Sequence, residues 1–246
     1  MRIVKFIIPV FFILSACSAP QQAQQTKSTF TFDYTPKESV KAGSINMLLA
    51  MIEPYYGASF QPGSSELFKS FRSAIGKDIE ELIVAKGFNL KGPYSSFDDM
   101  IFDDKKRSDI IIQIEMTPEF SAVQGSWKSR YNPLVAGNFT YTYAGKVSLV
   151  GKISLTGIEP MTNQKIWSKS VQIPSIEDIV IETTGKYTRP LQGAEVYEDP
   201  GIYNAVGKAL SAQYAGIMNK VAAQINAEEF VSMQPEIKEL KGKKGY

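Results

Sequence analysis

The cysteine at position 17 is the residue of this chain whose neighbours indicate a chemical reaction most clearly. It ends the tetrapeptide Leu-Ser-Ala-Cys, which has the form of a bacterial lipobox. A basic start with Arg2 and Lys5 and an apolar core over residues 6–14 precede it, as in a secretory signal. The pattern predicts that residues 1–16 are a lipoprotein signal peptide and that Cys17 receives acyl chains such as palmitate.

The apolar core of this signal is too short to remain as a membrane span, because a spanning helix needs about 20 apolar residues. Two or more acyl chains suffice for stable anchoring, so we expect outer-membrane lipid to be a partner through acylated Cys17. Ser18 follows where an Asp would retain a lipoprotein at the inner membrane, which favours the outer membrane. The alternative is a soluble secreted protein cut near Ala19. The lipoprotein interpretation is favoured because this cysteine is the only one in the chain.

Residues suited to catalysis are scarce. The chain has no histidine, which removes Ser-His-Asp and Cys-His nucleophile systems and imidazole metal sites. Neither Ser-x-x-Lys nor Gly-x-Ser-x-Gly occurs, and residues 145–152 lack the spacing of a phosphate loop. The aspartates between positions 98 and 104 lack EF-hand spacing. We therefore expect no catalytic residue, no metal site and no cofactor, with a glycosidase based on paired carboxylates as a distant alternative.

Charge gives a further exclusion. The chain has 27 basic and 25 acidic residues, and removal of Arg2 and Lys5 with the signal leaves 25 of each. A balanced chain has no strongly basic face for nucleic acid, so we expect no nucleic-acid partner.

Hydrophobic periodicity predicts the elements that must carry any binding site. Residues 17–28, which begin at the lipidated cysteine, are expected to be a disordered tether, and residues 29–246 a single α+β domain. Apolar residues recur every three to four positions over residues 65–86 and again over residues 203–225, which predicts two long helices. Strands are predicted at 30–34, 45–52, 88–90 and 110–114, with an antiparallel meander over 139–173. A short helix is predicted near 96–107, an irregular segment at 183–200 and a solvated basic tail at 238–244.

One irregular segment holds the candidate ligand residues. Residues 121–133 lose all periodicity and are predicted to be a long turn between strands. This loop contains Trp127, Lys128, Arg130 and Tyr131. Aromatic rings can cover the apolar face of a sugar, and a guanidinium can bond a carboxylate or hydroxyl, so the loop is a candidate glycan site. The alternative is that the two rings only pack the loop against the body.

Three stretches carry a family resemblance: Ile158-Glu159-Pro160-Met161, the terminal run 239–243 (Glu-Leu-Lys-Gly-Lys), and Asp98-Asp99 with Phe102, Lys105 and Lys106. In these the chain resembles the neuraminyllactose-binding haemagglutinin family, also called adhesin A or flagellar-sheath adhesin lipoproteins of Helicobacter-type bacteria. The resemblance implies a surface-exposed lipoprotein of the outer membrane or flagellar sheath that binds sialylated host-cell glycans. The family's dense basic run has only Lys128 and Arg130 in the corresponding region of this chain, so no binding residue is transferred from it.

These observations favour one fold and two functions. We expect an α+β protein with a mostly antiparallel sheet and two main helices packed on one face. The favoured function is non-catalytic attachment at the cell surface by an outer-membrane adhesin, with a host-cell glycan as ligand. The alternative is a periplasm-facing accessory lipoprotein that docks onto an envelope protein or a flagellar-sheath assembly.

Overall fold

Both long helices form where the periodicity places them, as the computed structural model shows. It describes residues 26–134 and 136–243, without the side chains of 122–124. The predicted signal peptide, Cys17 and the predicted tether up to residue 25 therefore lie outside the described residues. Gly87, with φ of 94°, follows the first helix and supplies the left-handed turn that ends it. Asp199 caps the second helix. The helices are α1 (Glu66–Ala85), α2 (Phe102–Arg107), α3 (Pro200–Gln224), α4 (Ala227–Ser232) and α5 (Gln234–Lys243), with 3₁₀ turns η1 (Gln61–Ser64) and η2 (Gly193–Glu198).

The strands form one six-stranded mixed sheet in the order β3-β1-β4-β5-β6, with β2 paired to β4. Short strand β1 pairs in parallel with β3 and β4, whereas the three long strands β4, β5 and β6 run antiparallel to one another. Most residue pairs in the sheet are therefore antiparallel, as expected. The strands are β1 (Leu48–Ile52), β2 (Tyr55–Tyr56), β3 (Asn89–Tyr94), β4 (Ile110–Tyr131), β5 (Phe139–Glu159) and β6 (Gln164–Glu182).

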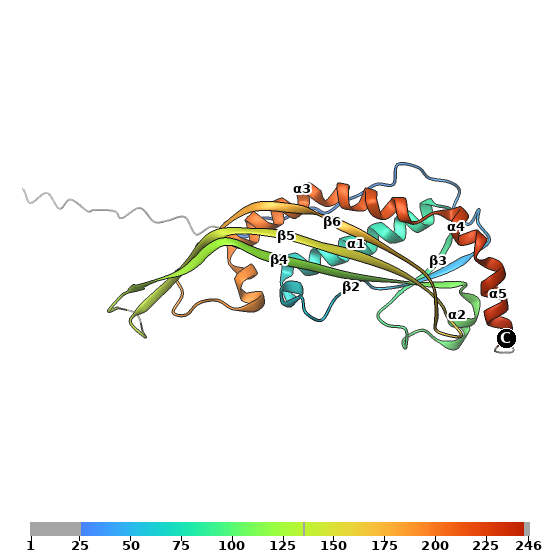
Figure 1. The fold of residues 1–246 in the computed structure, drawn as a ribbon, viewed down its shortest axis with the longest axis horizontal. Coiled ribbons are helices and arrows are strands. Elements are labelled where there is room, and N and C mark those ends of the chain that lie inside the picture. Colours follow the sequence, from blue (N-terminus) through green and yellow to red (C-terminus); the bar gives the residue numbers. More distant parts are fainter. Residues whose placement is uncertain (1–25, 135, 244–246) are drawn as a thin grey trace, which may run out of the picture.

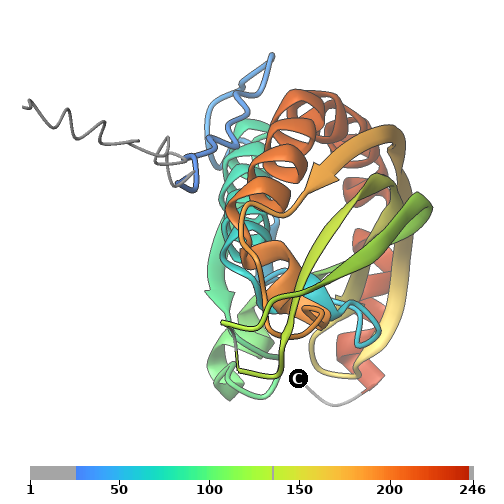
Figure 2. The same cartoon turned by 90° about the vertical axis from the view of Figure 1, so that its left-hand side faces the viewer.

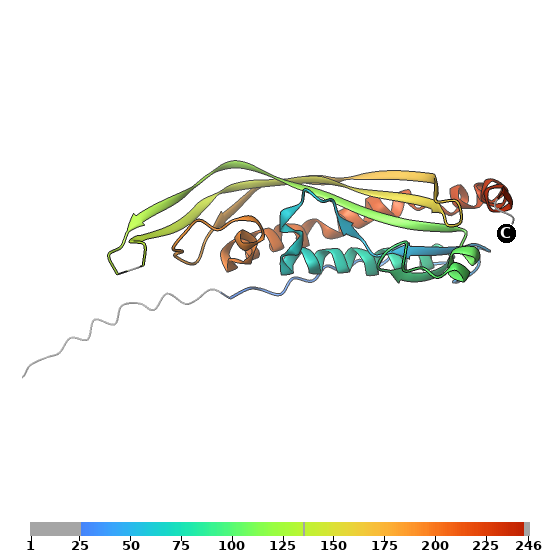
Figure 3. The same cartoon turned by 90° about the horizontal axis from the view of Figure 1, so that it is seen from below.

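Helices α1 and α3 lie side by side on one face of the sheet (Figure 1, Figure 3). Their apolar stripes, which include Ile79 and Leu210, pack with inward strand residues such as Ile112 and Leu155 into one core. Each fully buried aliphatic side chain of this size contributes about 1.5–3 kcal/mol to folding. A smaller cluster with Met100 covers part of the opposite face near β1. The prediction of an α+β fold with two main helices on one face is confirmed.

Residues 30–34 were expected to open the sheet as a strand, and this prediction is wrong. The segment is extended but lies outside the sheet, along α3, where Ser211 donates a hydrogen bond of 3.0 Å to the carbonyl of Thr31. Phe32 is buried between Phe71 and Tyr214, at ring distances of 5.3 and 5.5 Å. An extended chain shows alternating buried and exposed residues wherever it lies on one apolar surface. For residues 30–34 this surface is formed by helices and not by a neighbouring strand.

The prediction of a long turn at 121–133 is also wrong. Strand β4 continues through it to Tyr131 and pairs with β5, which makes a hairpin that projects past the helices (Figure 1). Pairing shifts at a bulge between Ala122 and Gln124, and Gly151 with φ of 149° lies opposite Pro118. Bulges and glycines bend a sheet ribbon locally. The hydrophobic signal of a strand is weak because only the base of the projecting part, at Tyr143, packs against the core.

The basic C-terminal tail is not a solvated end over its described residues. It forms α5, in which Ile237 and Leu240 are buried. Lys241 donates a hydrogen bond of 3.2 Å to the carboxylate of Asp109, which itself accepts a 2.9 Å bond from the amide of Leu48 at the start of β1. These contacts attach the tail to the sheet, so the sequence prediction of a free tail is wrong up to Lys243.

Candidate functional site

The projecting part of the β4–β5 hairpin, residues 125–134 and 136–145, is called the finger below. Strand β6 ends at Glu182, which pairs with Ala144, so the finger extends beyond the third long strand. Residues after β6 support one edge of it, because the backbones of Tyr141 and Tyr187 exchange hydrogen bonds of 2.7 and 3.0 Å. Figure 2 looks at the molecule from the finger end.

The register of the finger separates the four predicted site residues into two pairs. Directly opposed residues of an antiparallel pair share a face, and neighbours along a strand alternate. Trp127 is opposite Tyr143 and Tyr131 is opposite Phe139, with edge-to-face ring distances of 5.4 and 5.9 Å. These four rings and Tyr141 therefore form an aromatic face.

The two cations of the predicted site lie on the reverse of the finger. Lys128 is opposite Thr142 and Arg130 is opposite Thr140, on the side away from Trp127 and the other rings. A single sugar cannot stack on the ring of Trp127 and meet the guanidinium of Arg130 across the thickness of a strand pair. The joint site predicted from the sequence is not assembled in this structure, and ligand binding by either pair alone stays a prediction.

The aromatic face of the finger continues the core-facing side of β5. Val147 and Leu149 face the core, and the same alternation along the strand leads to Tyr143, which packs against the core, and then to Tyr141 and Phe139. Beyond the start of α3 the exposed fraction rises to 43% at Phe139, 61% at Tyr131 and 93% at Leu134. The sheet thus presents an apolar face past the point at which the helices cover it.

The connection between β6 and α3 is ordered around the buried carboxylate of Asp199. It accepts hydrogen bonds from the amides of Gly201 at 2.9 Å and Thr184 at 3.1 Å, and from the hydroxyl of Tyr187. Burial raises the pKa of the Tyr187 phenol, and the hydrogen bond to Asp199 and the charge of that carboxylate raise it further. Asp199 thereby connects the start of α3 to the residues that support the finger.

A second candidate site, an aromatic cleft, lies beside the base of the finger. It encloses about 700 Å³, within the usual range for small-molecule sites. The rings of Phe60 and Phe120 stack at 6.2 Å and Tyr197 lies 5.0 Å from Phe120. Buried Phe68 contacts all three rings edge-on from α1. Ser59 and Gln61 add polar groups to the cleft wall, and β4 lines it from Thr117 to Phe120.

Sequence reasoning missed this cleft, because its rings come from three separate segments. Phe60 precedes η1, Phe120 belongs to β4 and Tyr197 to η2. Burial raises the pKa of the Tyr197 phenol to about 12, so it stays a neutral hydrogen-bonding group. The lining contains one carboxylate, Glu119, and no Lys or Arg. An aromatic surface with neutral polar groups is suited to a neutral sugar.

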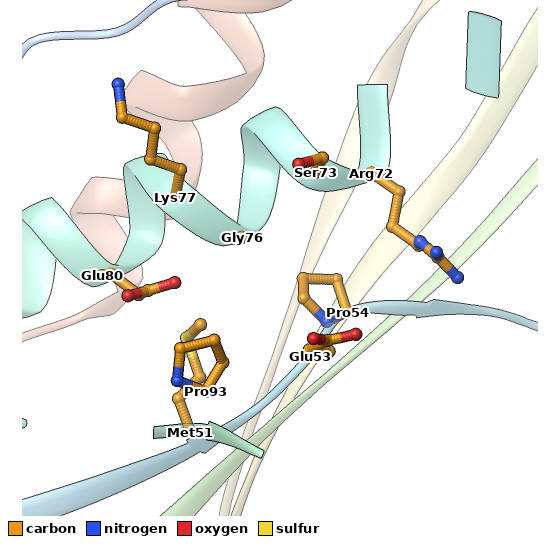
Figure 4. A pocket seen from close by; sticks show the side chains of 9 residues that line it. All are labelled: Met51, Glu53, Pro54, Arg72, Ser73, Gly76, Lys77, Glu80 and Pro93. Carbon is orange, nitrogen blue, oxygen red and sulfur yellow. The ribbon is translucent and has the colours of Figure 1, made fainter. Parts of the chain in front are cut away.

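A third, smaller cavity between α1 and the end of β1 encloses about 210 Å³ (Figure 4). Glu53, Arg72 and Glu80 line it, and the amine of Lys77 is turned away toward solvent. Burial raises the pKa of Glu80, and the nearby carboxylates of Glu53 and Glu81 raise it further. The cavity has mixed charges and no aromatic surface, so it suits a glycan less well than the cleft.

Within residues 26–134 and 136–243, no group of acidic residues is placed to hold a metal ion. The aspartates of the 98–104 region instead have protein partners: the carboxylate of Asp99 accepts from Ser96 at 2.8 Å and that of Asp104 from Tyr94 at 2.6 Å. No helix in the described part is long and apolar enough to cross a membrane.

Comparison with solved structures finds a similar fold in a Helicobacter pylori protein described as a homolog of the neuraminyllactose-binding hemagglutinin. The TM-score is 0.57 at 14% identity, over 86% of this chain and all of the other. At this identity, the comparison shows a similar fold only. A hypothetical Chlamydia trachomatis protein matches with a TM-score of 0.35 at 12% identity over 76% of this chain and 99% of its own. A Neisseria meningitidis lipoprotein matches with a TM-score of 0.26 at 10% identity over 69% and 99%.

Only the first of these comparisons has a TM-score that indicates a common fold. No family model matches the sequence, and no curated protein matches it. This distant fold relationship does not by itself place the chain in the hemagglutinin family. It does not transfer a ligand or a binding residue to this chain.

Proposed function

We propose that the protein is a non-catalytic, lipid-anchored lipoprotein of the outer membrane that acts in surface attachment. The lipobox at Cys17 supports the anchor, and the fold shared with a Helicobacter pylori hemagglutinin homolog supports an adhesin-type role. The sequence adds a negative argument, because the chain has no histidine for the common acid–base and nucleophile systems.

The aromatic cleft carries the binding part of this proposal. Phe60, Phe120 and Tyr197 give a ring surface for the apolar face of a sugar, and the hydroxyl of Ser59 and the amide of Gln61 can bond its hydroxyls. No cation lines the cleft, whereas recognition of a sialic acid carboxylate is strengthened by Arg or Lys. We therefore propose neutral hexose-containing glycans as the ligand class.

Substitutions on the polar wall test the cleft without removing its aromatic packing. Ser59→Ala and Gln61→Ala should each weaken binding to an array of neutral glycans by about tenfold, equivalent to about 1.4 kcal/mol. Ser175→Ala and Gln172→Ala are matched controls on exposed β6 positions and should bind normally. Normal binding by both cleft variants, with melting temperatures preserved, would refute the cleft as the glycan site.

Anchoring and orientation need separate measurements. Metabolic labelling with palmitate should label the wild-type protein but not a Cys17→Ser variant. Treatment of intact cells with a non-penetrating protease should then digest the protein while a periplasmic marker survives. Survival of the protein until lysis would contradict surface exposure.

The position of the finger favours a second candidate, the periplasm-facing accessory lipoprotein. The described chain begins beside the base of the finger, where Asn204 of α3 donates a 3.0 Å hydrogen bond to the carbonyl of Thr26. With an anchor attached at this end, the exposed rings of Tyr131 and Phe139 lie near the membrane, where they can dock onto an envelope protein. Protection from protease in intact cells is the result that this candidate predicts.

A further inference from the structure

The end of the finger is apolar, exposed and without acidic residues. Leu134 next to the turn is 93% exposed, and Tyr131 and Phe139 on the paired strands are 61% and 43% exposed. No Asp or Glu occurs between Glu119 and Glu159, although acidic residues are frequent elsewhere in the chain. The finger itself carries the cations Lys128 and Arg130 and therefore has a local charge of +2.

The described N-terminus lies at the same end of the molecule as the finger (Figure 3). Lys27 forms an ion pair with Glu198, and the amide of Ser28 donates a 2.7 Å hydrogen bond to Asn204 in the first turns of α3. The ring of Phe30 packs 5.9 Å from that of Tyr203. These contacts hold the start of the described chain close to Asp199, which supports the base of the finger.

The length of the intervening chain limits how far Cys17 can be from this point. Nine residue steps separate Cys17 from Thr26, and an extended chain covers at most about 3.3–3.6 Å per residue, which gives about 30 Å. The finger strand from Gly125 to Tyr131 covers about 20 Å at 3.4 Å per residue. A lipid attached at Cys17 therefore keeps the membrane within reach of the finger.

We propose that the finger is a second membrane contact, and that its tip enters the headgroup region of the same bilayer that holds Cys17. This inference rests on the lipid anchor of the proposed function, but not on glycan binding or on the side of the membrane that the protein faces. The apolar side chains of Leu134 and Phe139 leave water when the tip enters the bilayer. The rings of Trp127 and Tyr131 lie at the membrane–water interface.

The chemistry of a bilayer surface fits both faces of the finger. Trp and Tyr are enriched at membrane–water interfaces because each has an apolar ring and a polar group. Lys128 and Arg130, on the reverse face, can meet the phosphates of anionic headgroups. A glycan ligand would stack on the rings but would leave the exposed Leu134 without an apolar partner, whereas a bilayer supplies one. With an acyl anchor already present, the finger adds the second, weaker contact that orients the body on the membrane.

A fluorescent probe on the finger tests this contact in the full-length acylated protein. Cys17 is the only native cysteine and its thiol is blocked by acylation, so a Leu134→Cys variant can be labelled at one position with an environment-sensitive dye. Val231→Cys is the control, since Val231 is aliphatic, 42% exposed and located on α4 at the opposite end of the molecule (Figure 1). Both are reconstituted into vesicles of phosphatidylethanolamine and phosphatidylglycerol.

The expected result is a blue-shifted emission at position 134 and a several-fold loss of fluorescence when quencher-labelled lipid is included in the same vesicles. The probe at 231 should show neither effect. Solvent-like emission at both positions would overturn the inference. So would quenching at 134 only by lipid of a second vesicle population, or a blue shift at 134 that appears only when envelope extract is added, because either result assigns the finger to a different partner.

The anchor is measured on the same preparation, so that the two proposals can fail separately. Mass spectrometry of the N-terminal peptide reports whether Cys17 is acylated. If acyl chains are present and the 134 probe stays in water, only the finger inference fails. If they are absent, the proposed anchor fails, and the probe response to added vesicles still decides whether the finger binds lipid.

Discussion

The hydroxyl of Tyr214 on α3 donates a 2.7 Å hydrogen bond to the carboxylate of Asp78 on α1, inside the core between the two helices. Both side chains are 1% exposed. Burial raises the pKa of Asp78, whereas the Tyr214 hydrogen bond lowers it. This bond joins two helices that are separated by more than a hundred residues of sequence.

Tyr214→Phe should destabilise the protein by about 1–3 kcal/mol, because it leaves a buried carboxylate without this donor. Urea unfolding at neutral pH measures the effect. Tyr34→Phe is a matched control, since the Tyr34 hydroxyl makes only a long bond of 3.4 Å to Asn219. A loss no larger than that of Tyr34→Phe would show that the Asp78 bond contributes nothing particular.

Stability should also depend on pH through Asp78. Its pKa in the folded state is raised, by burial first and then by the charges of Glu81 and Asp33, with Lys77 and the Tyr214 bond acting in the opposite direction. The folded state therefore takes up this proton before the unfolded state does. The resulting stabilisation is complete below the unfolded pKa of about 3.9 and is lost as pH rises through the folded pKa.

Asp78→Asn removes this titration. The stability of the wild type minus that of the variant should therefore increase as pH is lowered from about 7 to about 5, a window above the unfolded pKa. Urea unfolding of both proteins at the two pH values checks the sign. A difference that falls on acidification would contradict the raised pKa.

Asp199→Ala should destabilise the protein by about 2–4 kcal/mol, from the lost helix cap and from buried donors left unpaired. Thr184 and Tyr187 would lose their acceptor, so the segment that supports the finger should open. Limited trypsin digestion after Lys186 would detect the opening. Glu177→Ala, at an exposed β6 position, should leave both stability and digestion unchanged; equal digestion of the two variants would argue against this role.

Gly207→Ala should detach the N-terminal segment from α3. A Cβ at Gly207 would lie 2.3 Å from the ring of Phe30, so the ring must move. We expect a loss of about 1–3 kcal/mol from this overpacking and faster amide exchange at residues 28–34. Gly216→Ala in the same helix has no neighbour within 4 Å and should stabilise the protein by about 0.5–1 kcal/mol. If both variants gain stability, Phe30 is not fixed on α3.

The local sequence was sufficient to predict those elements whose hydrophobic pattern repeats every few residues. The stripes of α1 and α3 and the β-branched run of residues 110–114 were identified correctly because burial against one core repeats at 3.6 or 2 residues. The same logic misassigned residues 30–34, since Phe32 and Tyr34 alternate over a helix surface instead of in a sheet.

The finger and the cleft depended on contacts that local patterns do not encode. Strand β4 continues to Tyr131 because its backbone bonds a partner strand, not because its side chains are buried, so the usual apolar alternation is absent. That pairing also decided that Trp127 and Arg130 lie on opposite faces. The sequence by itself determined the signal motif at Cys17, the lack of histidine chemistry and the two helices; only the tertiary structure brought Phe60, Phe120 and Tyr197 together, because long-range packing and strand register set the relative positions of distant side chains.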